Sequence, residues 1–173
     1  MATKMGRAAA MAVIGVGLAA GTAAAAPKLI QSNDGLTDFA TAAGQATDGA
    51  RAHVRVEATD AGGTRVRLHV TGLDQDAVGR TLGAHVHRGP CSENNGAGAL
   101  GHYKHGDQTA VATPENEIWL DFVVQPGGVG SADATVDFAI PDGAAGSVVI
   151  HERGTDNPGG GAGARYACIP VNF

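Results

Sequence analysis

Residues 50–71 read ARAHVRVEATDAGGTRVRLHVT, and the fold can be worked out starting from this stretch. Val54 and Val56 alternate with charged or polar neighbours, and the same alternation returns over residues 66–70. Period-two alternation is typical of a strand with one buried face, and the Gly62-Gly63 pair between the two runs is a hairpin signal. The stretch therefore predicts an antiparallel β-hairpin.

The same strand pattern recurs along the rest of the chain. It returns in residues 118–122, 134–140 and 147–151, which are separated by turn sequences such as Gln125-Pro126-Gly127-Gly128. The chain holds 27 glycines among 173 residues and has no long stretch with helical periodicity. Several short strands joined by glycine-rich turns favour an all-β fold, an antiparallel Greek-key sandwich or barrel of the immunoglobulin-like type.

The chain begins with the features of an export signal. Lys4 and Arg7 precede an apolar run over residues 8–20, and small residues at 22–26 favour cleavage after Ala25. Residues 1–25 are thus predicted to be a signal peptide, too short to span a bilayer, and no later segment predicts a membrane span. Residues 26–49 are expected to be a flexible leader able to add one edge strand, and residues 50–173 a single domain. The protein is expected to be secreted, or to work in the periplasm or cell envelope.

Net charge and cysteine content limit the classes of partner and the state of the two thiols. Loss of the signal removes two positive charges and no acids, which takes the net charge from −5 to −7 and disfavours nucleic acid or an anionic membrane as partner. The two cysteines, Cys91 and Cys168, would meet an oxidising compartment where a pair can form a disulfide. Two unpaired buried thiols are the alternative.

Six of the seven histidines fall into two groups. His53 and His69 lie out of phase with the apolar residues of their strands, so they are expected to be solvated. His85 and His87 form an H-x-H pair, which on a strand places both imidazoles on one face. With His102 and His151 they could form a four-histidine set from separate segments, and imidazole ligands suit Cu(II) well among divalent ions.

Five motifs carry a family resemblance over about residues 50–173. They are Leu82–His87, Cys91, Gly101–Tyr103, Val148–Glu152 and Ala162–Cys168, in that order along the chain. Together they resemble the copper-zinc superoxide dismutases. The resemblance implies copper ligands at His85, His87, His102 and His151, with His102 at the bridging position, and a disulfide between Cys91 and Cys168. It also implies that Arg165 orients superoxide beside the copper, and that His102 carries a proton to the reduced oxygen. A structural arginine bonded to carbonyl groups is the alternative for Arg165.

The zinc half of the family's site is incomplete in this sequence. Between His102 and His151 only His105 remains, where the family supplies two further histidines and an aspartate. His105 could join Asp107, Glu115 or Glu117 in a partial site, but a closed zinc site needs four ligands. Zinc is therefore doubtful, and the chain resembles copper-only, bacterial-type relatives.

In such relatives a carboxylate can hold the bridging histidine in place of zinc. Glu117 is the candidate, with Glu115 and Asp121 behind it, and a solvated carboxylate at a strand end is the alternative. The segment between His151 and Arg165 is short, with Glu152 and Asp156 as its acids, so the family's charged guiding loop is expected to be reduced.

The sequence leaves three functions to compare. The first is a superoxide dismutase that converts superoxide to dioxygen and hydrogen peroxide. The second is a non-catalytic copper-binding module that scavenges or delivers the metal, and the third is a structural protein without metal. The sequence predicts the first, and it does not determine the oligomeric state.

Overall fold

The hairpin at residues 50–71 is present as β3 (Arg51–Ala58) and β4 (Thr64–Thr71). The structure is a computed structural model that describes residues 29–39, 45–92 and 96–173. The two strands pair antiparallel from Arg51 with Thr71 to Ala58 with Thr64. The turn requires glycine at position 63, because a Cβ there would lie 2.1 Å from the carbonyl oxygen of Val136.

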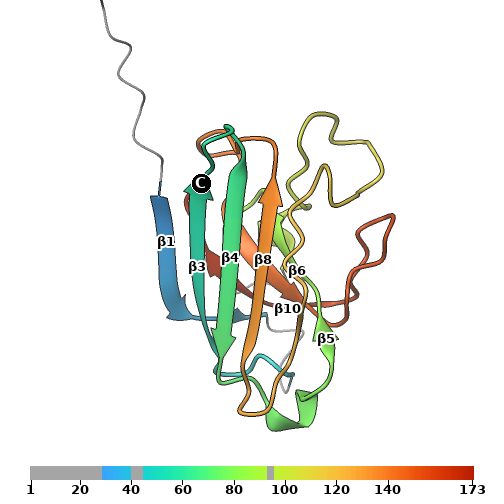
Figure 1. Ribbon diagram of the computed structural model, residues 1–173. Coiled ribbons are helices and arrows are strands. Elements are labelled where there is room, and N and C mark those ends of the chain that lie inside the picture. The colour runs from blue at the N-terminus through green and yellow to red at the C-terminus, as the bar shows by residue number, and fades with distance from the viewer. Residues whose placement is uncertain (1–28, 40–44, 93–95) are drawn as a thin grey trace, which may run out of the picture.

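The described strands form two four-stranded antiparallel sheets (Figure 1). The first has the order β1-β3-β4-β8 and the second β2-β10-β9-β6, while β5 and β7 form a small third pair. Neighbours that are far apart in sequence, such as β4 with β8 and β6 with β9, give Greek-key crossovers. The prediction of an all-β Greek-key sandwich is confirmed. The remaining strands are β1 (Leu29–Gly35), β2 (Thr37–Asp38), β5 (Thr81–Leu82), β6 (Ala84–His87), β7 (Phe122–Val123), β8 (Gly130–Val136), β9 (Ser147–His151) and β10 (Arg165–Pro170), and two short 3-10 helices span Gln75–Ala77 and Ala97–Ala99.

The core lies between the two sheets. In β3 and β4 every second residue is buried, as the alternation predicts for sheets with one face toward solvent. In contrast, all residues of β6 and β9 are buried. Two long segments, one after β6 and one between β9 and β10, extend from the same side of the sandwich in Figure 1. They supply the residues that surround the histidines of these strands.

The segment before residue 50 contributes to both sheets. β1 pairs along its whole length with β3, and β2 pairs with β10, so each takes an edge position. Residues 29–38 are therefore integral to the sandwich, although residues 26–49 were expected to be a flexible leader with at most one edge strand. The expected signal peptide lies outside the described residues, and the expected domain boundary at residue 50 stays a prediction.

Two strands differ in extent from the sequence prediction. Residues 118–121 make only an isolated bridge, between Trp119 and His85, and regular pairing begins at Phe122. The strand expected at 134–140 instead covers Gly130–Val136. Both segments keep the predicted burial of alternate residues, because Ile118, Leu120, Val136 and Phe138 face the core.

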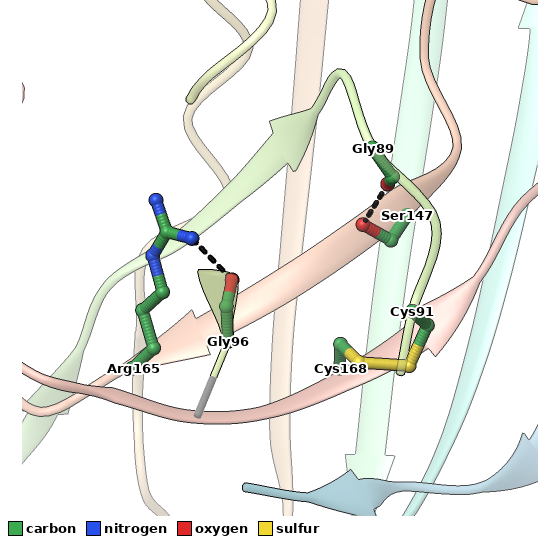
Figure 2. The surroundings of a disulfide bond; sticks show 6 residues. All are labelled: Gly89, Cys91, Gly96, Ser147, Arg165 and Cys168. Atoms are coloured by element: carbon green, nitrogen blue, oxygen red, sulfur yellow. Dashed lines mark hydrogen bonds between the residues drawn. A yellow bond between two sulfur atoms is a disulfide. The ribbon is translucent and has the colours of Figure 1, made fainter. Parts of the chain in front are cut away.

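A disulfide joins Cys91 to Cys168 across 77 residues of chain, as expected (Figure 2). In the chain-entropy account, closing a loop of this length stabilises the fold by about 4 kcal/mol. Nearby, the Ser147 hydroxyl donates to the carbonyl of Gly89 over 2.8 Å, which fixes the same connection to β9. Among the described residues, no helix is long and apolar enough to cross a membrane.

Candidate metal centre

Four histidines come together on one side of the second sheet. β6 supplies His85 and His87, whose side chains share a face because they are two residues apart, and His151 ends β9. His102 lies opposite His87 in an isolated bridge. One ring nitrogen from each of the four lies within 4.8 Å of the others. The structure thus brings together the four histidines that the resemblance assigned to copper.

Hydrogen bonding fixes which nitrogen of His85 is free. The amide of Thr155 donates to one oxygen of Asp121 over 2.6 Å, and its hydroxyl donates to the other over 2.6 Å. Because the hydroxyl proton is directed at the carboxylate, the hydroxyl oxygen accepts from His85 Nε2, which lies 2.7 Å away. Nδ1 of His85 is therefore the unprotonated nitrogen, and it is buried with no hydrogen-bond partner. A buried lone pair without a donor is what a metal ligand requires.

His87 and His102 are oriented in the same way. A carbonyl oxygen can only accept, so His87 Nδ1 donates to Leu100 over 3.2 Å and leaves Nε2 unprotonated. His102 Nδ1 lies 2.8 Å from a carboxylate oxygen of Glu117, which likewise leaves Nε2 free. His87 Nε2 is 3.3 Å from Nε2 of His151. Two imidazoles on one ion, with metal–nitrogen distances of about 2.0–2.1 Å, bring their nitrogens to this separation, so the donor set fits a metal ion.

Glu117 is buried beside His102. Its side chain is 1% exposed, and the same oxygen that accepts from His102 also accepts from the indole nitrogen of Trp119 over 2.8 Å. The alternative of a solvated carboxylate is therefore wrong, and Glu115, which was considered behind it, is exposed. Asp121 does not contact His102 but supports His85 through Thr155. Asp121, the further candidate for holding His102, therefore serves His85 instead.

The environment keeps the ligand histidines neutral. Burial, followed by repulsion from His102, lowers the pKa of His87 to about 2 and that of His151 to about 3. The same causes hold the pKa of His85 far below its usual range. The positive charge of Arg165 acts in the same direction on all three. Neutral imidazoles with free lone pairs are the form that binds a transition metal.

Arg165 lies opposite His151 where β10 pairs with β9. Its guanidinium donates to the backbone carbonyls of Gly96 and Leu100, and the contact to Gly96 is visible in Figure 2. It therefore makes the carbonyl contacts of a structural arginine while its charge reaches the histidines. Partial burial lowers its pKa, but the group remains cationic.

The side chains expected near a zinc ion are arranged differently. The His105 ring stacks on Phe138 with 4.4 Å between ring centres, and the Asp107 carboxylate accepts from Thr109. Within residues 29–39, 45–92 and 96–173, no group of three or more metal-binding side chains includes His105. The expectation that His105 might share a site with Asp107, Glu115 or Glu117 finds no support in this geometry.

A hollow of about 210 Å³ lies beside the His102–Glu117 pair. Arg88 and Lys104 both line it. Two cationic side chains disfavour a second divalent cation next to His102.

Two residues that orient the ligand histidines were not predicted from the sequence. Thr155 lies in a glycine-rich loop where no pattern marks it, and Leu100 acts through its backbone carbonyl. Leu100 has φ 59°, the one positive φ outside glycine among the described residues, and its carbonyl accepts from both His87 and Arg165.

Comparisons with known proteins support the fold. A double mutant of a SOD-like protein from Bacillus subtilis matches with a TM-score of 0.57 and 17% identity, over 82% of this chain and 97% of that one. A second structure of a SOD-like protein from Bacillus subtilis gives 0.53 and 14%, over 80% and 96%. The clock protein EA4 gives 0.53 and 19%, over 84% and 92%.

No family model matches the chain, and no curated protein matches it. The structural likenesses show that the chain has the fold of superoxide-dismutase-like proteins. With a disulfide and four clustered histidines on that fold, the molecule has a candidate metal site.

Proposed function

We propose that this protein is a copper-dependent superoxide dismutase that works outside the cytoplasm after loss of residues 1–25. The observation that carries the proposal is the set of unprotonated nitrogens described above. His85, His87 and His102 each have one ring nitrogen in a hydrogen bond, which leaves the other free, and one nitrogen from each of the four histidines lies within 4.8 Å of the others. His151 supplies the fourth nitrogen.

Copper is the metal that best suits this set. Four imidazoles provide nitrogen ligands only, and the affinity order of divalent ions favours Cu(II). When bound, copper supplies one-electron chemistry by changing between Cu(II) and Cu(I). Overall, two superoxide ions and two protons give one dioxygen and one hydrogen peroxide.

Two residues of the chain would serve the substrate and the protons. The Arg165 guanidinium, held by two backbone carbonyls, places a fixed positive charge beside the histidines and would attract and orient the superoxide anion. His102 Nε2 would take up a proton and deliver it to the reduced oxygen. During this exchange Glu117 would hold the ring through Nδ1.

We further propose that the enzyme works without zinc, as a copper-only, bacterial-type member of the copper-zinc superoxide dismutase family. Glu117 would take the part of zinc, because a buried carboxylate bonded to His102 Nδ1 orients the imidazole as a second metal would. The positive charges of Arg88 and Lys104 beside this pair support the same view.

The test is metal content together with superoxide dismutation, measured on protein loaded with copper, zinc or both. About one tightly bound copper per chain, little zinc and fast turnover are expected. Tight zinc at one ion per chain in addition to copper would contradict the zinc-free form. Copper without turnover would leave the scavenging or delivery module as the function.

Variants of Arg165 separate the enzyme from the binding module. Arg165→Ala should lower the rate at least about tenfold while copper is retained, and Arg165→Lys, which keeps the charge, should lose less. Arg153→Ala is the matched control, because Arg153 is exposed and pairs with Asp156. An unchanged rate in Arg165→Ala would contradict the role given to this residue.

A further inference from the structure

The outer face of the first sheet carries two histidines that the candidate metal centre does not use. His53 on β3 and His69 on β4 are directly opposite each other in the antiparallel register. Both point away from the core, because their neighbours on either side in sequence are buried. They line one hollow on this face, of about 560 Å³.

Their placement suits shared coordination. Directly opposed residues on neighbouring antiparallel strands have Cβ atoms roughly 4.5–5.5 Å apart. Imidazole nitrogens bind transition metals at about 2.0–2.1 Å, so two rings at this spacing can turn toward one ion between them. His69 is exposed and His53 half-buried, so both rings have room to rotate.

His69 also has a partner that orients it. Its Nδ1 lies 2.8 Å from the hydroxyl of Ser131, the residue opposite it on β8. A hydrogen bond to one ring nitrogen leaves the other as the metal-binding nitrogen, and such partners commonly accompany histidine ligands. On the other side of His53, Asn33 of β1 lies directly opposite it and adds a polar neighbour.

The charged side chains around this hollow determine which kind of metal ion could bind there. Arg55 and Arg67 line it with Asp133. Glu57 pairs with both arginines at 2.6 and 3.1 Å, and Asp133 pairs with Arg67 at 3.2 Å. Arg65 also binds Asp133, so three arginines share two carboxylates and the face carries one positive charge in excess. Each arginine is partly neutralised by its ion pair, no carboxylate is left for a metal, and binding would rest on the histidine nitrogens. Calcium and magnesium, which need oxygen ligands, are therefore disfavoured.

We propose that His53 and His69 form a second, surface site for a borderline transition metal ion, with Cu(II) preferred over Ni(II) and Zn(II). Water would complete the coordination. With two protein ligands the site would bind more weakly and exchange its ion faster than the buried four-histidine site. It is independent of the proposed enzymatic activity, because its residues lie on the opposite sheet.

Titration of Cu(II) into full-length protein whose buried site already holds one copper tests the proposal. A second Cu(II) per chain is expected, with a nitrogen-coordinated electron paramagnetic resonance signal of its own. His53→Gln and His69→Gln should each weaken it at least about tenfold, the scale on which even groups that orient a ligand affect affinity. Excess Ca(II) or Mg(II) should not displace it.

Two controls separate this site from other binding. His105→Gln, which changes an exposed histidine stacked on Phe138, should leave the second ion unchanged. A His85→Gln, His87→Gln double variant should lose the buried copper and keep the surface ion, so failure of one site is distinguishable from failure of the other. Absence of a second ion in the unaltered protein, or its unchanged binding in both His53→Gln and His69→Gln, would overturn the proposal.

Discussion

The Thr155 hydroxyl oxygen lies 2.7 Å from Nε2 of His85 and donates its own proton to Asp121. A loop residue thereby determines which nitrogen of a strand histidine is available to a metal. The loop between β9 and β10 is thus part of the metal centre, although none of its side chains belongs to the four-histidine set.

Replacement of Thr155 should change the proposed copper site and leave the fold intact. Thr155→Val keeps the shape but removes the acceptor for His85 Nε2, so copper affinity should fall about 10–100-fold. Thr155→Ser keeps the hydroxyl and should retain near-normal affinity. Copper competition with a chelator of known affinity measures both. Equal affinities in the two variants would show that the hydroxyl does not orient His85.

Replacement of Glu117 should affect His102 selectively. In Glu117→Gln the buried charge that holds Nδ1 is lost, and the dismutation rate should fall about 10–100-fold with copper still bound. The exposed Glu115, two residues earlier, provides the control Glu115→Gln, which should keep the full rate. A Glu117→Gln protein with normal turnover would remove the proposed substitute for zinc.

Gly160 packs against the His102–Glu117 hydrogen bond. A Cβ at this position would lie 2.8 Å from the Cβ of Ala112 and 3.2 Å from the bonded oxygen of Glu117. Gly160→Ala should therefore displace the pair and slow dismutation. Gly159→Ala is the matched control, since Gly159 also has a positive φ but a Cβ added there would meet no atom within 4 Å. Alanine is at least as strained at Gly159, with φ 118°, as at Gly160, with φ 72°, so a lower rate in Gly160→Ala than in Gly159→Ala reports on the pair.

Leu100 occupies a backbone conformation that favours glycine, with φ 59° and ψ −152°. Conformations of this kind cost about 1–3 kcal/mol in residues other than glycine, so Leu100→Gly should raise the free energy of unfolding by about 1 kcal/mol. Leu29→Gly removes a leucine of equal exposure, 51%, from a strand and should lower it. Urea unfolding measures both, and a destabilised Leu100→Gly protein would contradict this account.

Acid should destabilise the metal-free protein. The pKa of His151 is lowered to about 3 by burial and by His102, and the pKa values of His85 and His87 are lowered in the same way. Unfolded histidine has a pKa of about 6.5, so below that pH the unfolded chain binds more protons than the folded one. The stabilisation is complete above pH ~6.5 and is lost as the pH falls toward about 3.

Unfolding in urea at several pH values, after removal of metal with a chelator, measures this slope. Each buried histidine can contribute at most about 1.4 kcal/mol per pH unit. His151→Gln should make the slope shallower, and His105→Gln should leave it unchanged. Identical slopes in all three proteins would show that the buried histidines do not titrate as described.

Much of the architecture could be predicted because it follows from patterns of two or three residues. Alternation at Val54 and Val56 with Gly62-Gly63 gave the hairpin, and the H-x-H pair placed His85 and His87 on one face. The role of Thr155 could not be predicted, because it depends on Asp121, 34 residues earlier, which only the folded loop brings near. The pairing of β1 with β3 could not be predicted with its full length either, because Ser32 and Asn33 are weak strand formers that are held in place by β3.

The Cys91–Cys168 disulfide also affects when Arg165 can reach its final position. It joins β10, which carries Arg165, to the connection that leads to Gly96, whose carbonyl holds the guanidinium (Figure 2). A newly made chain in a reducing cytoplasm would have both thiols free, and the arginine would lack this anchored partner. We therefore expect maturation to be ordered, with oxidation first and a correctly placed arginine afterwards. If the chain is exported and acts as proposed, Arg165 would reach its final position only outside the cytoplasm.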